Sequence, residues 1–192
     1  VPGQVESDAS IKYGAGQIRT NLDLLKAVRG KHPDDYILYK PHPDVVAGLR
    51  AKGSDGVAMD QYCDEIIGDV GMADLLDEID EVHTMTSLTG FEALMRSKKV
   101  VTYGMPFYAG WGLTVDVGMI ESVSARRGRP LALDELVAGA LILYPTYVGY
   151  STEKRSTPEE VLGELRELKK TPPHKRSLKQ MFLRWVLSIR KY

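Results

Sequence analysis

A positively charged side chain and a histidine come directly after a short apolar run. Residues 36–39 have the length of a buried strand, and Lys40, Pro41, His42 and Pro43 follow them. In an open parallel sheet, ligands bind beyond the carboxyl ends of the strands. Lys40 can supply a charge for a phosphate, and His42 can donate to phosphate or ribose oxygens. Because the two prolines stiffen the loop, the motif indicates either a phosphate-binding loop or a rigid turn with a surface histidine.

Hydroxyl side chains follow a second apolar run, at the point where a helix is expected to begin. Ser87 and Thr89 come after residues 81–85, and hydroxyls with free N–H groups at a helix start form an anion site. Capping of the helix by either hydroxyl is the alternative. Glu92 lies one turn inside the same helix, where it faces either the crevice or solvent. Two such loops after different strands of one sheet favour a shared ligand site.

Residues 104–114 form a third candidate, because they combine three glycines with three aromatic residues. Glycine permits close approach of the backbone, and aromatic rings offer flat faces for a base or a sugar. Tyr108, Gly110 and Trp111 are therefore candidate ligand contacts. The alternative is a loop that plugs the end of the core.

Three polar side chains near the N-terminus form a fourth candidate. Gln4, Glu6 and Asp8 lie between Gly3 and Gly14. A carboxylate in such a glycine-flanked loop can serve as a nucleophile or as an acid/base. Solvated loop acids are more frequent, so the residues alone favour that alternative.

Cysteine and histidine positions show no metal signature. Cys63 has no second cysteine to pair with, and His32, His42, His83 and His174 are scattered along the chain. A single cysteine also excludes an intrachain disulfide and fits a reducing compartment. We therefore expect neither a metal ion nor a cofactor.

The predicted elements that must position these motifs alternate between strands and helices. Strands are expected at 36–39, 65–67, 81–85 and 99–103, with helices at 17–29, 45–52, 73–79 and 87–97. This order, with short connections, predicts an α/β fold with a parallel sheet covered by helices. Residues 1–16 are expected to form a loop, and further helices are expected at 132–143, 158–169 and 175–191. Thr157 as the cap, with Glu160 three residues later, marks the start of the helix at 158–169.

Composition indicates an ordinary globular domain, expected over residues 1–170, with an unusual tail. The 192 residues are 43% hydrophobic and 27% charged, a balance sufficient for a sizeable core. Eight of the 25 basic residues and none of the 26 acidic residues lie in 169–192, which leaves residues 1–168 with a formal charge of −9. Residues 171–192 are expected to form a basic amphipathic helix that docks on an anionic membrane surface. Packing of this helix on the body or on another domain is the alternative.

Several classes of protein are disfavoured by what the sequence lacks. No apolar run reaches the roughly 18 residues that a membrane-spanning helix needs, and the first residues do not form a signal peptide. No recognised nucleic-acid motif accompanies the basic tail. We therefore expect a cytoplasmic protein that does not bind nucleic acid, and the missing initiator methionine indicates a piece of a longer protein.

Four stretches of the sequence resemble the capsular polysaccharide β-Kdo transferase family of the KpsC/LipA type. They are residues 2–11 (PGQVESDASI), 39–43 (YKPHP), 87–94 (SLTGFEAL) and 106–114 (PFYAGWGLT), in the family's order. The last stretch is long and specific. His-Pro followed by a Ser/Thr loop is shared more loosely with other CMP-sugar transferases, such as bacterial sialyltransferases.

The resemblance implies a GT-B-type glycosyltransferase of two Rossmann-like domains. This chain would be the donor-binding half, a Rossmann-like parallel sheet with helices on both faces, and the N-terminal acceptor domain of the same module would be missing. The implied donor substrate is CMP-Kdo. The implied reaction is retaining β-Kdo transfer, which builds a poly-Kdo linker on a phosphatidylglycerol terminus. The acceptor would be a lipid-linked Kdo at the inner face of the cytoplasmic membrane.

The resemblance also assigns roles to the N-terminal loop. The family's Gln-x-x-x-Asp motif falls on Gln4 and Asp8, which makes Asp8 the candidate active-site carboxylate, as nucleophile or as acid/base. The chain alone is expected to bind the nucleotide without transferring sugar. Two alternatives remain open, a non-catalytic capsule-assembly scaffold and a transferase for another CMP-sugar such as sialic acid.

Overall fold

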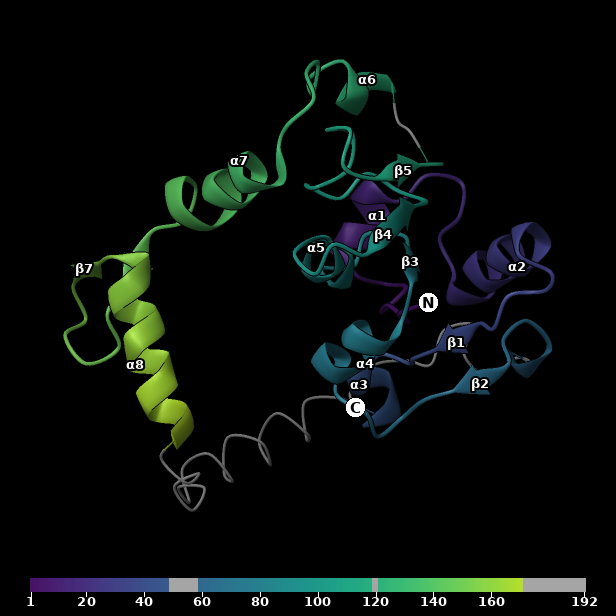
Figure 1. Ribbon diagram of the computed structural model, residues 1–192, viewed down its shortest axis with the longest axis horizontal. Helices are drawn as coiled ribbons and strands as arrows, with labels where there is room; N and C mark the ends of the chain where they lie inside the picture. Colours follow the sequence, from purple (N-terminus) through teal and green to yellow (C-terminus); the bar gives the residue numbers. More distant parts are fainter. Residues whose placement is uncertain (49–58, 119–120, 171–192) are drawn as a thin grey trace, which may run out of the picture. The chain divides into compact units, whose positions relative to one another are not determined.

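Parallel strands occupy the centre of the first of two structural units, Val1–Leu136 (Figure 1). The computed structural model describes residues 1–48, 59–118 and 121–170. In this unit β1 (Leu38–Tyr39) pairs with β2 (Glu65–Ile66), and a second sheet has the order β3 (Glu81–Thr84), β4 (Lys99–Thr102), β5 (Val115–Asp116). Every one of these pairings is parallel, which confirms the expected α/β class and the four expected strands.

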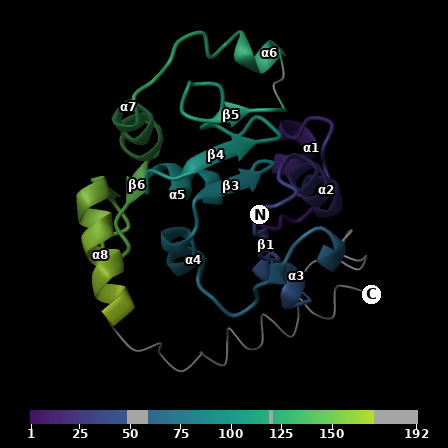
Figure 2. The ribbon, with the colours of Figure 1, turned by 45° about the vertical axis from the view of Figure 1, so that its right-hand side comes forward.

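The N-terminal segment joins the two groups of strands. Gly3 N donates to the carbonyl of Lys40 at 2.7 Å, and Lys40 N donates to the carbonyl of Val1 at 3.0 Å, so the segment runs parallel to β1. On its other side, the Gln4 side-chain oxygen accepts from the hydroxyl of Thr84 at 3.2 Å. Figure 2 accordingly shows the N-terminus between β1 and β3.

Helices of the first unit lie on both sides of the β3–β4–β5 sheet. In chain order they are α1 (Ala9–Gly14), α2 (Asn21–Lys31), α3 (Pro43–Val46), α4 (Met72–Glu78), α5 (Thr89–Leu94), α6 (Glu121–Ser124) and α7 (Leu133–Ala138), with a 3-10 turn at Met59–Gln61. Helix α7 runs across the boundary between the two units. Figure 1 shows α2 and α5 on opposite sides of β3 and β4.

The main core lies between α2 and one face of the sheet. Leu24, Leu25 and Val28 of α2 are buried in one cluster with Val101 and Tyr103. The buried residues of α5 are not in this cluster, because side chains alternate between the two faces along a strand. Each face of the sheet is therefore covered by a helix.

Helix boundaries in the first unit follow capping side chains rather than the apolar period. The expected loop 1–16 contains α1, because Asp8 caps a helix there. The expected helix 17–29 begins only at Asn21, because Thr20 accepts a backbone hydrogen bond and caps it. Of the expected helix 45–52, residues 45–48 are described, and Val45 and Val46 lie within α3.

The second unit begins at Val137 and contains a hairpin followed by a helix. After a π-helical stretch (Gly139–Leu143), β6 (Tyr147–Val148) pairs antiparallel with β7 (Arg155–Ser156), and α8 (Pro158–Lys170) follows. The expected capping signal of α8 is confirmed, since Glu160 N donates to Thr157 Oγ1 at 3.2 Å and Thr157 N donates to Glu160 Oε2 at 3.1 Å. Among the described helices, none is long and apolar enough to cross a membrane. The expected tail helix 175–191 lies outside the described residues.

Candidate functional site

Three of the loops marked by the sequence meet beside the N-terminal segment, where β1 and β3 end in two separate sheets rather than in the single sheet that was expected. A Cβ atom on Gly3 would lie 3.1 Å from the backbone nitrogen of His42, so the N-terminal loop contacts the loop after β1. The Gln4 amide donates to the hydroxyl of Thr86 at 2.9 Å, and its oxygen accepts from Thr86 N at 3.0 Å. These bonds tie the N-terminal loop to the segment that leads into Ser87.

Lys40 carries a buried positive charge. The residue is only 7% exposed, and its ammonium donates to the carbonyl of Gly68 at 3.2 Å. Within the described part of the chain, no carboxylate forms an ion pair with it. Burying a charge without a partner is costly, so this position favours an anionic ligand.

His42 is oriented by the start of a helix. Its Nδ1 accepts from the backbone N–H of Asp44 at 3.1 Å, and Pro43 is the first residue of α3. A neutral imidazole that accepts at Nδ1 carries its hydrogen on Nε2. The half-buried His42 ring can therefore donate from Nε2 to an oxygen of a ligand.

The two hydroxyls after β3 bond to one another. Ser87 Oγ accepts from Thr89 N at 3.2 Å and donates to Thr89 Oγ1 at 3.0 Å. Tyr108 supports this turn from the third candidate loop, since its hydroxyl donates to the carbonyl of Ser87. Tyr108 is fully buried, and a Cβ atom on Gly90 would lie 2.3 Å from its oxygen. Glu92, which follows on α5, is half-buried.

The loop 104–114 is held in place by two side chains that bond to its backbone, those of Asp116 and Arg127. Gly110 has a φ of +75°, and its N–H donates to Asp116 Oδ2 at 2.8 Å. The Arg127 guanidinium lies 5.7 Å from the centre of the Trp111 ring and donates to two backbone carbonyls of the loop, at 2.6 Å each. Asp116 and Arg127, which the sequence analysis did not mark, thus fix the position of Trp111.

Another unmarked residue, Asn21, fixes the N-terminal loop. Its Oδ1 accepts from Gln4 N at 2.8 Å, and its Nδ2 donates to the carbonyl of Gln4 at 2.9 Å. Asn21 N in turn donates to Glu6 Oε1 at 2.8 Å. Asp8 Oδ1 accepts from Ser10 N at 2.8 Å at the start of α1. Asn21 stands inside the expected helix 17–29, so no signal in the sequence pointed to this contact.

A cavity of about 480 Å³ lies beside this convergence of loops. Lys40 and Thr89 line it, together with residues of β1, α4 and β3. Two of the candidate ligand contacts, Lys40 and Thr89, therefore open onto one cavity.

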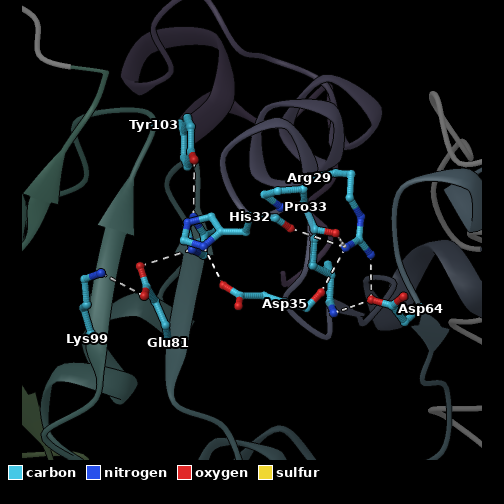
Figure 3. A network of polar contacts seen from close by, with 10 residues as sticks. Arg29, His32, Pro33, Asp35, Asp64, Glu81, Lys99 and Tyr103 are labelled. Carbon is cyan, nitrogen blue, oxygen red and sulfur yellow. Dashed lines mark hydrogen bonds and ion pairs between the residues drawn. The ribbon is translucent and has the colours of Figure 1, made fainter.

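Three titratable side chains that appear scattered in the sequence line the same cavity. Figure 3 shows two of them, His32 and Glu81, close to each other. One ligand atom from each of His32, Glu81 and His83 lies within 4.8 Å of the other two, so this group could hold a metal ion. Burial lowers the pKa of His83 to about 4, against the opposing effect of Glu81, so its imidazole is neutral at pH 7. Because His32 is far from His83 in sequence, spacing alone could not reveal the group.

Comparison with known proteins places the chain in a family. Residues 1–147 match the family described as "Capsule polysaccharide biosynthesis protein". The chain belongs to this family. Among its relatives, the capsule polysaccharide modification protein LipA of Neisseria meningitidis serogroup A is 53% identical over 159 residues, which cover 83% of this chain and 22% of LipA. The lipopolysaccharide-processing protein LpsZ of Rhizobium meliloti is 46% identical over 147 residues, which cover 77% of this chain and 32% of LpsZ.

Two solved structures share the fold of this family member. The β-Kdo 2,7 transferase of Thermosulfurimonas dismutans KpsC is 51% identical with a TM-score of 0.75, over 88% of this chain and 53% of that chain. The β-Kdo 2,4 transferase of the same KpsC is 34% identical with a TM-score of 0.73, over 85% of this chain and 50% of that chain. The resemblance inferred from the four motifs is confirmed. This chain spans about half of each solved chain.

Proposed function

We propose that this chain is the donor-binding part of a retaining β-Kdo glycosyltransferase that uses CMP-Kdo in capsular polysaccharide synthesis. The observation that carries the proposal is the 51% identity, at a TM-score of 0.75, to a solved β-Kdo 2,7 transferase. This chain would form a Rossmann-like half of a GT-B-type module, and an N-terminal domain would bind the acceptor. Transfer is assigned to the complete module, so this chain alone binds nucleotide without transferring Kdo.

The CMP phosphate is proposed to lie against Lys40 and His42. The buried Lys40 ammonium, which has no carboxylate partner in the described residues, supports an anion at this position. Hydrogen bonds between charged groups are about twice as strong as neutral ones, so Lys40 and the Nε2 of His42 provide much of the affinity. The hydroxyls of Ser87 and Thr89 donate to further oxygens of the nucleotide.

Five further residues are proposed to complete the donor site. Pro43 sets the start of α3 and so the orientation of the histidine ring before it. Tyr108 supports the serine carbonyl, and the tightly bonded loop around Gly110 presents Trp111 for contact with the base or the sugar. Glu92 contributes a polar group from the helix that follows the hydroxyl loop.

Asp8 is proposed as the active-site carboxylate, either as nucleophile or as acid/base. Gln4 and Glu6 belong to the same catalytic loop, where their hydrogen bonds to Thr86 and Asn21 support a positioning role. Removing either side chain would therefore displace Asp8 rather than remove a reacting group.

The proposed product is a poly-Kdo linker on a phosphatidylglycerol terminus, made at the inner face of the cytoplasmic membrane from a lipid-linked Kdo acceptor. A lipid acceptor favours contact between the basic tail 171–192 and an anionic membrane surface. Co-sedimentation of the intact enzyme with anionic liposomes, with and without residues 175–192, tests this contact. Equal and salt-insensitive binding by both proteins would refute it.

Transfer assays on the full-length protein test the proposed activity. The assays use a lipid-linked Kdo acceptor with either CMP-Kdo or CMP-sialic acid as donor. We expect transfer from CMP-Kdo with retention of the anomeric configuration, read by NMR of the product, and none from CMP-sialic acid. Transfer from CMP-sialic acid alone would redirect the assignment to another CMP-sugar. A protein that binds neither donor nor CMP would be a non-catalytic scaffold, and the proposal would fail.

A further inference from the structure

His32, Glu81 and His83 come from two elements and meet at the wall of the cavity. His32 follows the last residue of α2, and the other two lie on β3. Side chains two residues apart on a strand project from the same face, which brings Glu81 and His83 together. The three ligand atoms lie within 4.8 Å of one another. Two imidazoles and one carboxylate form the ligand set of zinc sites that keep one open position.

One oxygen of Glu81 lacks a hydrogen-bond partner. Oε2 is paired with the ammonium of Lys99 at 2.9 Å, but the buried Oε1 accepts no hydrogen bond from the described residues. Nε2 of His83 lies 3.2 Å from Oε1 without the geometry of a hydrogen bond. Two ligand atoms on one tetrahedral zinc ion stand about 3.3–3.5 Å apart, so this spacing fits a shared cation.

Both histidines have the outer contacts that metal-binding histidines usually have. Nδ1 of His32 lies 2.7 Å from a carboxylate oxygen of Asp35, and Nδ1 of His83 lies 3.3 Å from the hydroxyl of Tyr103. Such contacts orient the ring and direct the other nitrogen toward the metal. In His83 this contact leaves Nε2 beside Glu81, and in His32 it leaves Nε2 as the nitrogen available to a metal ion.

We propose that Nε2 of His32, Oε1 of Glu81 and Nε2 of His83 bind a Zn²⁺ ion. The three residues line the cavity that Lys40 and Thr89 also line, so water or an oxygen of a bound ligand completes the tetrahedron. The ion joins the end of α2 to β3. This site is separate from the proposed donor contacts and does not depend on the transferase assignment.

Zinc binding to the purified, untagged protein tests the site. After treatment with a chelator, the protein is titrated with ZnCl₂ by calorimetry, and its melting temperature is measured with and without Zn²⁺. We expect a zinc site that raises the melting temperature. Co²⁺ used as a spectroscopic probe should give the visible absorption of a tetrahedral nitrogen and oxygen site.

Three variants show whether the zinc lies in this cluster. His32→Gln removes a ligand whose side chain is 26% exposed, and it should abolish both the site and the gain in melting temperature. Asp35→Asn changes an outer contact that is 70% exposed and should weaken binding by about 10–100-fold. His42→Asn, at a histidine outside the cluster, is the control and should bind zinc like the wild type. The proposal is overturned if the wild type binds no zinc, or if His32→Gln binds it unchanged.

Discussion

The N-terminal loop and the loop after β1 lie against each other, yet their polar side chains have different partners. In the first loop, Gln4, Glu6 and Asp8 all accept hydrogen bonds from the protein. In the second, the ammonium of Lys40 bonds, among the described residues, to a backbone carbonyl at 3.2 Å, and His42 bonds to the backbone through one ring nitrogen. The polar side chains of the first loop therefore hold the loops in shape, whereas the second loop contains the side chains that we propose to contact the ligand.

This difference can be measured, because the two kinds of residue should affect different quantities. Replacing a residue that holds the loops should lower the free energy of unfolding. Replacing a residue that contacts the ligand should lower nucleotide affinity at nearly constant stability.

Replacing Asn21 should have the largest effect. Asn21→Ala leaves the buried N–H and carbonyl of Gln4 without partners, and each such group costs about 1–3 kcal/mol. We expect a loss of about 2–4 kcal/mol in urea unfolding. The control Asp23→Ala removes an exposed pair at 3.9 Å on the same helix and should cost less than about 1 kcal/mol. Equal losses in the two variants would show that Asn21 does not hold the loop.

Tyr108→Phe tests whether the aromatic loop supports the hydroxyl loop. The change removes the hydrogen bond to the carbonyl of Ser87 and should cost about 1–2 kcal/mol, because that group is left unpaired near the core. Thermal unfolding measures the loss. Tyr13→Phe, at a side chain that is 75% exposed, serves as the control. If both variants melt like the wild type, Tyr108 does not support Ser87.

Lys40→Met should separate affinity from stability. The variant keeps the length of the side chain and removes a buried charge, so unfolding should stay within about 1 kcal/mol of the wild type. Affinity for CMP should fall by about 1.5–3 kcal/mol, the value of a hydrogen bond to a charged group. Lys26→Met, at an exposed lysine, should alter neither quantity. Unchanged CMP affinity in Lys40→Met would remove Lys40 from the donor site.

Asp8→Asn should have the smallest effect on stability. Asparagine caps a helix as well as aspartate does, so unfolding should change by less than about 0.5 kcal/mol, whereas Asp8→Ala should lose about 1 kcal/mol with the cap. In the full-length protein, both variants should lose Kdo transfer. Retained transfer by Asp8→Asn would exclude a catalytic carboxylate at this position.

The fold was predictable where local pattern determines structure. Apolar runs marked β1 to β4, and the Thr157 and Glu160 pair marked the start of α8. Strand β5 has only two residues and forms beside β4 through tertiary contacts, including the bond from Thr102 to Asp116 at 2.8 Å. Val115 stands between the polar residues Thr114 and Asp116, so the sequence shows no apolar run there.

The candidate loops could be located because each follows a strand, but their supporting residues could not. Asn21, Asp116 and Arg127 act on backbone groups that only the folded chain brings near them. The contact between His32 and His83 likewise depends on how α2 packs on β3. Sequence motifs therefore locate a site, whereas the contacts that position it require the structure.

Calorimetric titration with CMP, comparing the wild type with His42→Asn, tests the central claim most directly. Asparagine retains the cap of α3 but lacks the ring nitrogen that is proposed to donate to the nucleotide. We predict that the wild type binds CMP, and that His42→Asn loses about 1–3 kcal/mol of binding free energy, about 5–150-fold in affinity, with little change in unfolding. A wild type that binds no CMP, or a variant of unchanged affinity, would contradict the proposed donor site.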